Sequence, residues 1–197
     1  MNLGPMHWLL GMEVKRDHVA QAISLSQKAY LSSIIAWFHL EDAPSISTPM
    51  EARAQLVQAE NDTSTGPHVP YKEIIGSLMY AGKAMWPDIA FTVLALTQFT
   101  QDPARTHWEA TKCIVRYLKG MRDLELTYGS SNTRIVRYTD ADHASQYHRH
   151  SISGYTFLVN GGTVSWSSKK QSVMALSTTE AEYVAATHTM KEALWLQ

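Results

Sequence analysis

The spacing of apolar residues changes along the chain, and each change predicts a different kind of element. Residues 8–14 are largely apolar and residues 19–25 alternate, so both are expected to be strands, joined by a polar turn at 15–18. From 27 to 38 the apolar residues recur at helical spacing, which predicts an amphipathic helix with Ser26 as its N-cap. The chain is therefore expected to begin with a β-hairpin followed by a helix.

Helical spacing returns after a long polar stretch. Residues 41–70 combine several Pro residues and Gly66 with many Ser, Thr, Asn, Asp and Glu residues, a composition that predicts a loop or linker. Three helices are expected beyond it, over residues 71–83, 87–99 and 103–119, with Gly120 ending the third. The pattern predicts a helical bundle that packs on a flat element.

Strand patterns dominate the last third of the chain until a final helix. Four short strands are expected, over residues 124–128, 135–139, 155–159 and 163–167. Asn160-Gly161-Gly162 joins the last two and is a strong hairpin signal. A long helix is expected over 177–196, and its pattern continues to the last residue, so the chain is expected to be cut rather than finished.

Composition and charge narrow the function classes. The 197 residues are 45% hydrophobic and 18% charged with a formal net charge of -1, so contact with nucleic acid would need local basic patches. A single cysteine, Cys113, excludes an internal disulfide framework and a Cys-rich zinc site. Because no apolar run is long enough to cross a membrane and no signal peptide is visible, we expect an intracellular protein, cytoplasmic or nuclear, that contacts no membrane.

Two acidic residues, Asp140 and Asp142, close the strand expected before them. Carboxylates held close together repel each other, and a bound cation such as Mg²⁺ offsets that repulsion. Asp is also common where strands end in a solvated turn. Considered without other residues, the pair favours the turn over a metal site.

A second acidic pair lies at the start of the final helix. Ser177 and Glu180 have the Ser-x-x-Glu spacing of a capping box, which predicts that the Glu180 carboxylate folds back to the Ser177 amide. Glu182 lies about 200° further around the helix and is free of that role. Glu182 is therefore the better candidate for a metal ligand, the alternative being a favourable charge in the first helical turn.

Histidine and lysine side chains flank these acidic motifs. His143, His148 and His150 could suggest zinc, but their surroundings are more typical of an exposed, weakly basic loop near a phosphate backbone. Lys169 and Lys170 follow Trp-Ser-Ser and could hold a nucleic-acid backbone, or they could lie in a solvated turn before the helix. The residues themselves leave both alternatives for the lysine pair open.

Together, these and other short motifs resemble the C-terminal reverse transcriptase region and the start of the ribonuclease H domain of Ty1/copia-type retrotransposon Pol polyproteins. Each motif is weak by itself, but their number and their order along the chain make the resemblance specific. The motifs lie at residues 8–14 (Trp-Leu-Leu-Gly-Met-Glu-Val), 23–30, 47–50, 71–80, 87–91, 107–108, 116–120, 138–142 (Tyr-Thr-Asp-Ala-Asp), 153–155, 165–171, 176–183 and 191–196.

The resemblance implies an α/β (α+β) fold: a helical connection region over residues 1–128, then part of a ribonuclease H-like mixed sheet with a helix over 129–197. It implies hydrolysis of RNA in RNA–DNA hybrids with Mg²⁺ or Mn²⁺. Asp140 and Glu182 would be catalytic metal ligands with Asp142 assisting, and Lys169 and Lys170 would lie near the hybrid or another nucleic acid. The rest of the Pol polyprotein would be a further partner.

Departures from the family pattern bear on activity. The Tyr-x-Asp-Asp polymerase motif is absent, and the family's third ribonuclease H carboxylate would lie beyond residue 196. His143-Ala144-Ser145 stands where the family has Trp-Ala-Gly, which changes the loop after the acidic strand. We therefore expect weak Mg²⁺ binding and a nearly inactive fragment. The alternatives are a non-catalytic nucleic-acid-binding remnant and a decayed reading frame.

Overall fold

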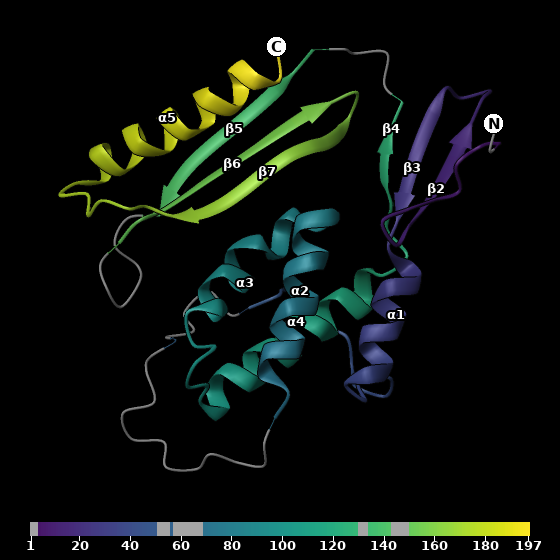
Figure 1. Cartoon of the computed structure of the whole chain (residues 1–197), viewed down its shortest axis with the longest axis horizontal. Helices are drawn as coiled ribbons and strands as arrows, with labels where there is room; N and C mark the ends of the chain where they lie inside the picture. The colour runs from purple at the N-terminus through teal and green to yellow at the C-terminus, as the bar shows by residue number, and fades with distance from the viewer. Residues whose placement is uncertain (1–3, 51–55, 57–68, 130–133, 143–149) are drawn as a thin grey trace. The chain divides into compact units, whose positions relative to one another are not determined.

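The computed structural model describes residues 4–50, 56, 69–129, 134–142 and 150–197, which form two compact units. One unit is Met1–Gly129 and the other is Ser130–Gln197, and each is considered by itself. Helices and antiparallel sheets occur in the chain, so the expected mixed α/β class is confirmed (Figure 1). Among the described residues, no helix combines the length and the apolar character that crossing a membrane requires.

A four-stranded antiparallel sheet brings together both ends of the N-terminal unit. Its strands are β1 (Trp8–Leu9), β2 (Met12–Asp17), β3 (Ala22–Ser26) and β4 (Leu126–Tyr128), in the order β1-β2-β3-β4. The expected hairpin is present, because β2 and β3 pair in antiparallel register. The strand β4 returns from the far end of the unit to pair with β3.

The turn expected at residues 15–18 is wrong, because β2 continues through Asp17. The Asp17 carboxylate accepts hydrogen bonds from the backbone amides of Val19 and Ala20, both at 2.9 Å. These bonds lower the pKa of Asp17 and fix the turn after it rather than before it. The first expected strand is also divided, since Leu10 and Gly11 have positive φ angles of 49° and 75° and form the turn between β1 and β2.

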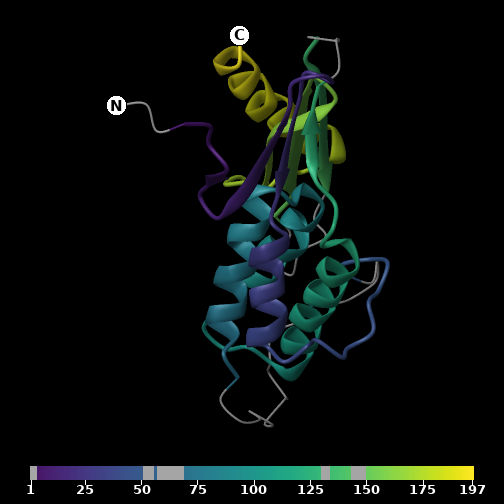
Figure 2. The ribbon, with the colours of Figure 1, turned by 90° about the vertical axis from the view of Figure 1, so that its right-hand side faces the viewer.

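The helices lie side by side in this unit (Figure 2). They are α1 (Lys28–Trp37), α2 (Tyr71–Ala84), the 3₁₀ turn η1 (Pro87–Ile89), α3 (Ala90–Thr97) and α4 (Arg105–Met121). The four expected helical segments are confirmed, with the second of the three later ones beginning as a 3₁₀ turn at its proline. The fully buried side chains are contributed mainly by the helices, and the largest are Tyr71, Leu31, Ile74, Leu78, Ile89, Leu96, Ile114 and Leu118.

Two predictions about helix ends are wrong. Gln27, not Ser26, occupies the N-cap position of α1, and the Ser26 hydroxyl accepts the Lys28 amide at 3.3 Å from just before it. Gly120 does not end the third helix, since α4 continues to Met121. A Cβ at Gly120 would lie 3.1 Å from the Cβ of Ser45, so this glycine allows the first part of the 41–70 stretch to pack closely on α4.

Basic side chains of α4 donate hydrogen bonds to the backbone of residues 41–44. The Arg116 guanidinium donates to the Pro44 carbonyl at 2.7 Å, and the Lys119 ammonium donates to the carbonyls of Ala43, at 2.8 Å, and Glu41. These cations therefore satisfy backbone oxygens within the unit.

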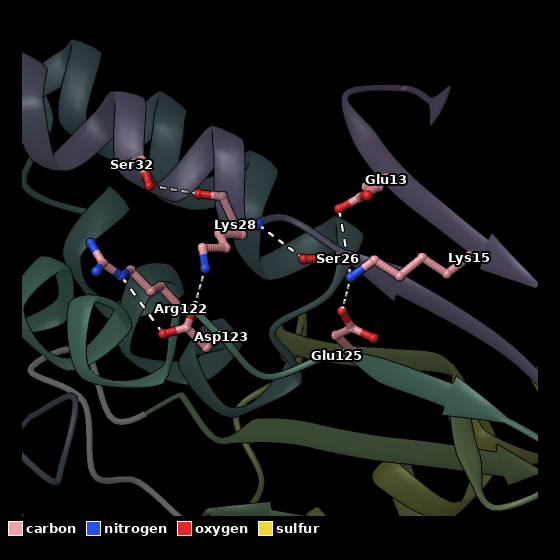
Figure 3. A network of polar contacts seen from close by, with 8 residues as sticks. All are labelled: Glu13, Lys15, Ser26, Lys28, Ser32, Arg122, Asp123 and Glu125. Carbon is pink, nitrogen blue, oxygen red and sulfur yellow. Dashed lines mark hydrogen bonds and ion pairs between the residues drawn. The ribbon is translucent and has the colours of Figure 1, made fainter. Parts of the chain in front are cut away.

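Exposed ion pairs join the sheet and α1 to the segment after α4 (Figure 3). Lys15 Nζ lies 2.6 Å from Glu125 Oε1, and Lys28 Nζ lies 2.6 Å from Asp123 Oδ1. The Lys28 hydrogen bond holds the pKa of Asp123 below its ordinary value. Because these groups are solvated, they align the elements more than they stabilise them.

Gly129 offers a direct test of how β3 and β4 pack. A Cβ at this position would lie 2.7 Å from the Cβ and 3.0 Å from the Cα of Ala22, and backbone cannot move away cheaply. We expect Gly129→Ala to lower the free energy of unfolding by about 1–3 kcal/mol, measured by urea denaturation. The control is Gly76→Ala in α2, where no atom lies within 4 Å, and which should raise stability by about 0.5–1 kcal/mol. Equal stability of the two variants would contradict this packing.

The C-terminal unit is a three-stranded antiparallel sheet with one helix along it (Figure 1). Its strands are β5 (Val136–Asp142), β6 (Ile152–Val159) and β7 (Gly162–Lys170), in the order β5-β6-β7, and its helix is α5 (Thr178–Trp195). The β6–β7 hairpin and the final helix are confirmed. Asn160 and Gly161 have φ angles of 51° and 83°, so the predicted Asn-Gly pair makes this turn.

Candidate functional site

The helix α5 covers one face of the C-terminal sheet, and hydrogen bonds identify that face. The Thr189 hydroxyl lies 2.8 Å from the Thr139 hydroxyl on β5, and the Ser165 hydroxyl on β7 donates to the Glu192 carboxylate at 2.6 Å. Phe157 on β6 pairs in register with Ser165 and is fully buried. Thr139, Phe157 and Ser165 therefore point toward α5.

Asp140 and Asp142 lie on the other face. Successive side chains of a strand alternate between faces, and the register of β5 is regular from Val136 to Asp142, so both carboxylates point away from α5. Asp140 is opposite Gly154 on β6, and Asp142 is opposite Ile152. Both aspartates belong to the strand itself, which extends further than the sequence pattern predicts.

Ser177 and Glu180 form the predicted cap with one difference. Ser177 is the N-cap of α5, and its hydroxyl accepts the Glu180 amide at 3.2 Å. The Glu180 carboxylate does fold back, but it accepts the Leu176 amide at 2.8 Å rather than the predicted Ser177 amide. Glu180 therefore serves the helix start, as the spacing predicts.

Glu182 lies on the side of α5 nearer β5. Residues of an α-helix are separated by about 100°, so Glu180 and Glu182 lie on opposite sides of the buried Ala181. Further along the helix, Thr189 hydrogen-bonds to β5 and Glu192 hydrogen-bonds to β7. Viewed down the helix axis, Glu192 lies about 60° from Thr189 in the direction opposite to the rotation from one residue to the next. Rotation about the helix axis in the direction of increasing residue number therefore leads from the buried face toward β5. Glu182 lies about 100° from Ala181 in that direction, on the side of β5.

The first turn of α5 lies near the end of β5. The Ala181 carbonyl accepts a hydrogen bond from Gln171, which also bonds Ser153, and Ser153 pairs with Ala141 on β5. Because Thr189 meets Thr139, the helix runs antiparallel to β5. The first turn of α5, which contains Glu182, therefore lies near the end of β5 that holds the aspartates, whereas the aspartates point to the face of the sheet that α5 does not cover.

The carboxylates at this end of the sheet are of the ligand type that Mg²⁺ prefers, but they are few. Carboxylate oxygens are the ligands that Mg²⁺ prefers, and one or two of them often suffice when water and substrate phosphates complete the shell. Within the parts of the chain that the structure describes, no group of three or more His, Cys, Asp or Glu side chains could hold a metal ion. His143 and His148 lie outside the described residues.

The lysine pair lies in a strand rather than in a turn, so the turn alternative is wrong. Lys169 and Lys170 are the last two residues of β7 and point to opposite faces of the sheet. Lys170 is in the same cross-strand row as Ile152 and Asp142, which places it on the face of the aspartates. Lys169 pairs with Ser153 and is exposed on the other face.

Two polar features of this unit have no local signal in the sequence. Gln171 is 3% exposed although it follows two lysines and precedes a serine. Tyr155 lies beneath α5, and burial raises its pKa, with the Glu192 carboxylate adding to the rise and the Ser165 hydroxyl opposing it. Only the register between strands and helix brings these groups together.

The fold and the site thus define a mixed α/β protein with carboxylates at one end of a small antiparallel sheet. The chain is 41% identical over its whole length to the "Retrovirus-related Pol polyprotein from transposon TNT 1-94" of Nicotiana tabacum, of which it spans 15%. Over 66% of its length it is 45% identical to "Secreted RxLR effector protein 161" of Plasmopara viticola, covering 92% of that protein. It is also 31% identical to the "Putative transposon Ty5-1 protein YCL074W" of Saccharomyces cerevisiae, with 97% of the chain and 62% of that protein covered.

The chain therefore belongs to the same family as the Plasmopara viticola protein, and its homologues include retrovirus-related Pol polyproteins of transposons. The chain spans 15% of the length of the Nicotiana tabacum polyprotein. A match to so short a segment does not identify which activity of that polyprotein the segment carries. No family model and no solved structure matches the chain.

Proposed function

We propose that residues 130–197 form a ribonuclease H-like unit of a retrotransposon Pol polyprotein whose parent activity is metal-dependent hydrolysis of RNA in RNA–DNA hybrids. The proposal is supported by the position of Asp140 and Asp142 on one face at the end of β5, with the first turn of α5, which contains Glu182, tied to the same end of the sheet. The homology to Pol polyproteins supports the retrotransposon origin that the proposal assumes. Residues 1–129 would then be the reverse transcriptase connection region.

A divalent ion, when bound here, would activate water and offset charge on the leaving oxygen. Asp140 and Asp142 would bind it from one face of β5, with water and substrate phosphates completing the shell, and Glu182 in the first turn of α5 would be the further carboxylate proposed for this end of the sheet. Lys170, on the face of the aspartates, would attract the phosphate backbone of the hybrid. Two carboxylates on one face are few for tight binding, so the unit should bind Mg²⁺ or Mn²⁺ weakly and hydrolyse little.

A hybrid-cleavage assay with Mg²⁺ or Mn²⁺ tests this proposal. We expect the chain to exceed the Asp140→Asn variant by less than about tenfold in rate, which corresponds to about 1.4 kcal/mol of transition-state stabilisation. Asp102→Asn, which removes an exposed carboxylate of the N-terminal unit, is the matched control and should equal the unaltered chain. Robust cleavage that Asp140→Asn abolishes would sustain the ribonuclease assignment but refute the low activity.

A non-catalytic nucleic-acid-binding role is the second candidate, and the placement of Lys169 at the exposed end of β7 favours it. In that case hybrid binding would depend on salt and would survive Asp140→Asn, whereas Lys169→Ala would reduce the salt dependence by about one unit of slope. Lys72→Ala on the surface of α2 would leave it unchanged. Absence of binding at low salt would exclude both roles.

A further inference from the structure

Gln171 is a buried polar residue at the junction of three elements in the C-terminal unit. It follows the last residue of β7 and is 3% exposed. Its Nε2 donates one hydrogen bond to the Ser153 hydroxyl on β6 and a second to the Ala181 carbonyl in α5, both at 2.9 Å. The side chain therefore ties the first turn of the helix to the sheet beneath it.

The backbone of Gln171 is fixed by the neighbouring segment. Its amide donates to the Ser151 carbonyl at 2.9 Å, and its carbonyl lies 3.0 Å from Nδ1 of His150. Ser151 is itself fully buried. The sheet therefore fixes the position of the Gln171 side-chain amide, because the Gln171 backbone directly follows β7 and its partner Ser153 belongs to β6.

The Gln171 side chain is retained although part of it is unsatisfied. Its Oε1 is buried without a hydrogen-bond partner among the described residues, which is a cost that an apolar side chain of the same size would avoid. The Ala181 carbonyl also lies within the helix, where it is positioned to accept the amide four residues on. The bond from Nε2 is therefore not needed to satisfy that carbonyl, and its effect is to hold the helix in place.

We propose that Gln171 is the positioning residue for the acidic end of the sheet. Ala181, which it holds, is flanked by the capping Glu180 and by Glu182, so fixing this carbonyl sets the depth and rotation of Glu182 relative to β5. This inference rests on the proposed function in one respect, the role of Glu182 toward a divalent ion. The mechanical role of Gln171 in the first turn of α5 does not depend on it.

The test is Gln171→Met in the full chain, a change that keeps the side-chain length and removes both donors. We expect the amides of residues 181–185 to exchange with solvent about tenfold faster, while those in the second half of α5 and in β6 keep their rates. Mn²⁺ affinity, measured by titration at a temperature where every variant is folded, should fall by about tenfold. A role in stability alone would lower the unfolding midpoint and leave the Mn²⁺ affinity unchanged.

Gln27→Met is the matched control, since Gln27 is 1% exposed and lies in the other unit. It should change neither the exchange at residues 181–185 nor the Mn²⁺ affinity. Unchanged exchange at these amides in Gln171→Met would overturn the inference. If the unaltered chain binds no Mn²⁺, the proposed metal site fails, and the exchange measurement still decides the role of Gln171.

Discussion

Replacing Phe157 by alanine is expected to unfold most of the C-terminal unit. Phe157 is 0% exposed, faces α5 from the middle strand and meets the Tyr155 ring edge-on at a centroid distance of 5.5 Å. The helix side chains buried against the sheet are small, and they are Ala181, Ala185, Thr189 and Ala193. With no large side chain on the helix to move into the cavity, the loss should reach about 3–5 kcal/mol.

This loss is comparable to the whole stability of a small domain, which is about 5 kcal/mol at the lower end of the usual range. Dispersion of the backbone NMR signals from β6 and β7 should therefore collapse at room temperature, while the signals of α2 and α4 persist. Tyr138→Ala is the control, because Tyr138 is an aromatic residue of the adjacent strand but is 61% exposed on the opposite face. An unfolding free energy within about 1 kcal/mol of the unaltered chain would show that Phe157 does not hold this layer together.

The elements that the sequence predicts well are those whose apolar spacing decides their packing. The segments 27–38 and 71–83 carry helical stripes, and most of the apolar residues in those stripes are buried in α1 and α2. The errors occur where contacts distant in sequence determine the local structure. Gly120 has the properties of a helix stop, but the approach of Ser45 gives it another role.

Strand lengths could not be predicted from composition for a related reason. Pairing continues as long as a neighbouring strand supplies partners, so β7 includes Lys169 and Lys170, which alone are typical of a turn. The same pairing extends β5 through Asp140 and Asp142. These polar residues are therefore the last paired residues of their strands rather than the first residues of a turn.

The chemistry of the candidate site is visible in the sequence, but its geometry is not. Capping by Glu180 follows from local spacing, because its partners lie within four residues. The side of α5 on which Glu182 lies relative to β5, and the face to which Asp140 points, depend on the helix bonds of Thr139 and Ser165. Gln171 escaped prediction because burial of a polar side chain follows from tertiary contacts alone.

The N-terminal unit should respond as strongly to a cavity at Leu78. This residue of α2 is 0% exposed and belongs to the cluster of buried side chains that joins α1, α2, α3 and α4. Leu78→Ala removes three carbon atoms from the buried cluster and leaves a cavity there. We expect the free energy of unfolding to fall by about 2–5 kcal/mol, measured by urea denaturation followed by far-UV circular dichroism.

Met79→Ala provides the comparison, since Met79 is the next residue of α2 and is 37% exposed. Alanine has a higher helix propensity than methionine, and little buried surface is lost, so the change should stay within about 0.5 kcal/mol. If α2 contributes to the buried core through Leu78, the two substitutions must differ clearly in the free energy of unfolding that they remove. If Leu78→Ala and Met79→Ala shifted the urea midpoint equally, the burial of Leu78 at the centre of the helical bundle would be wrong, because only a buried position leaves a cavity when it is truncated.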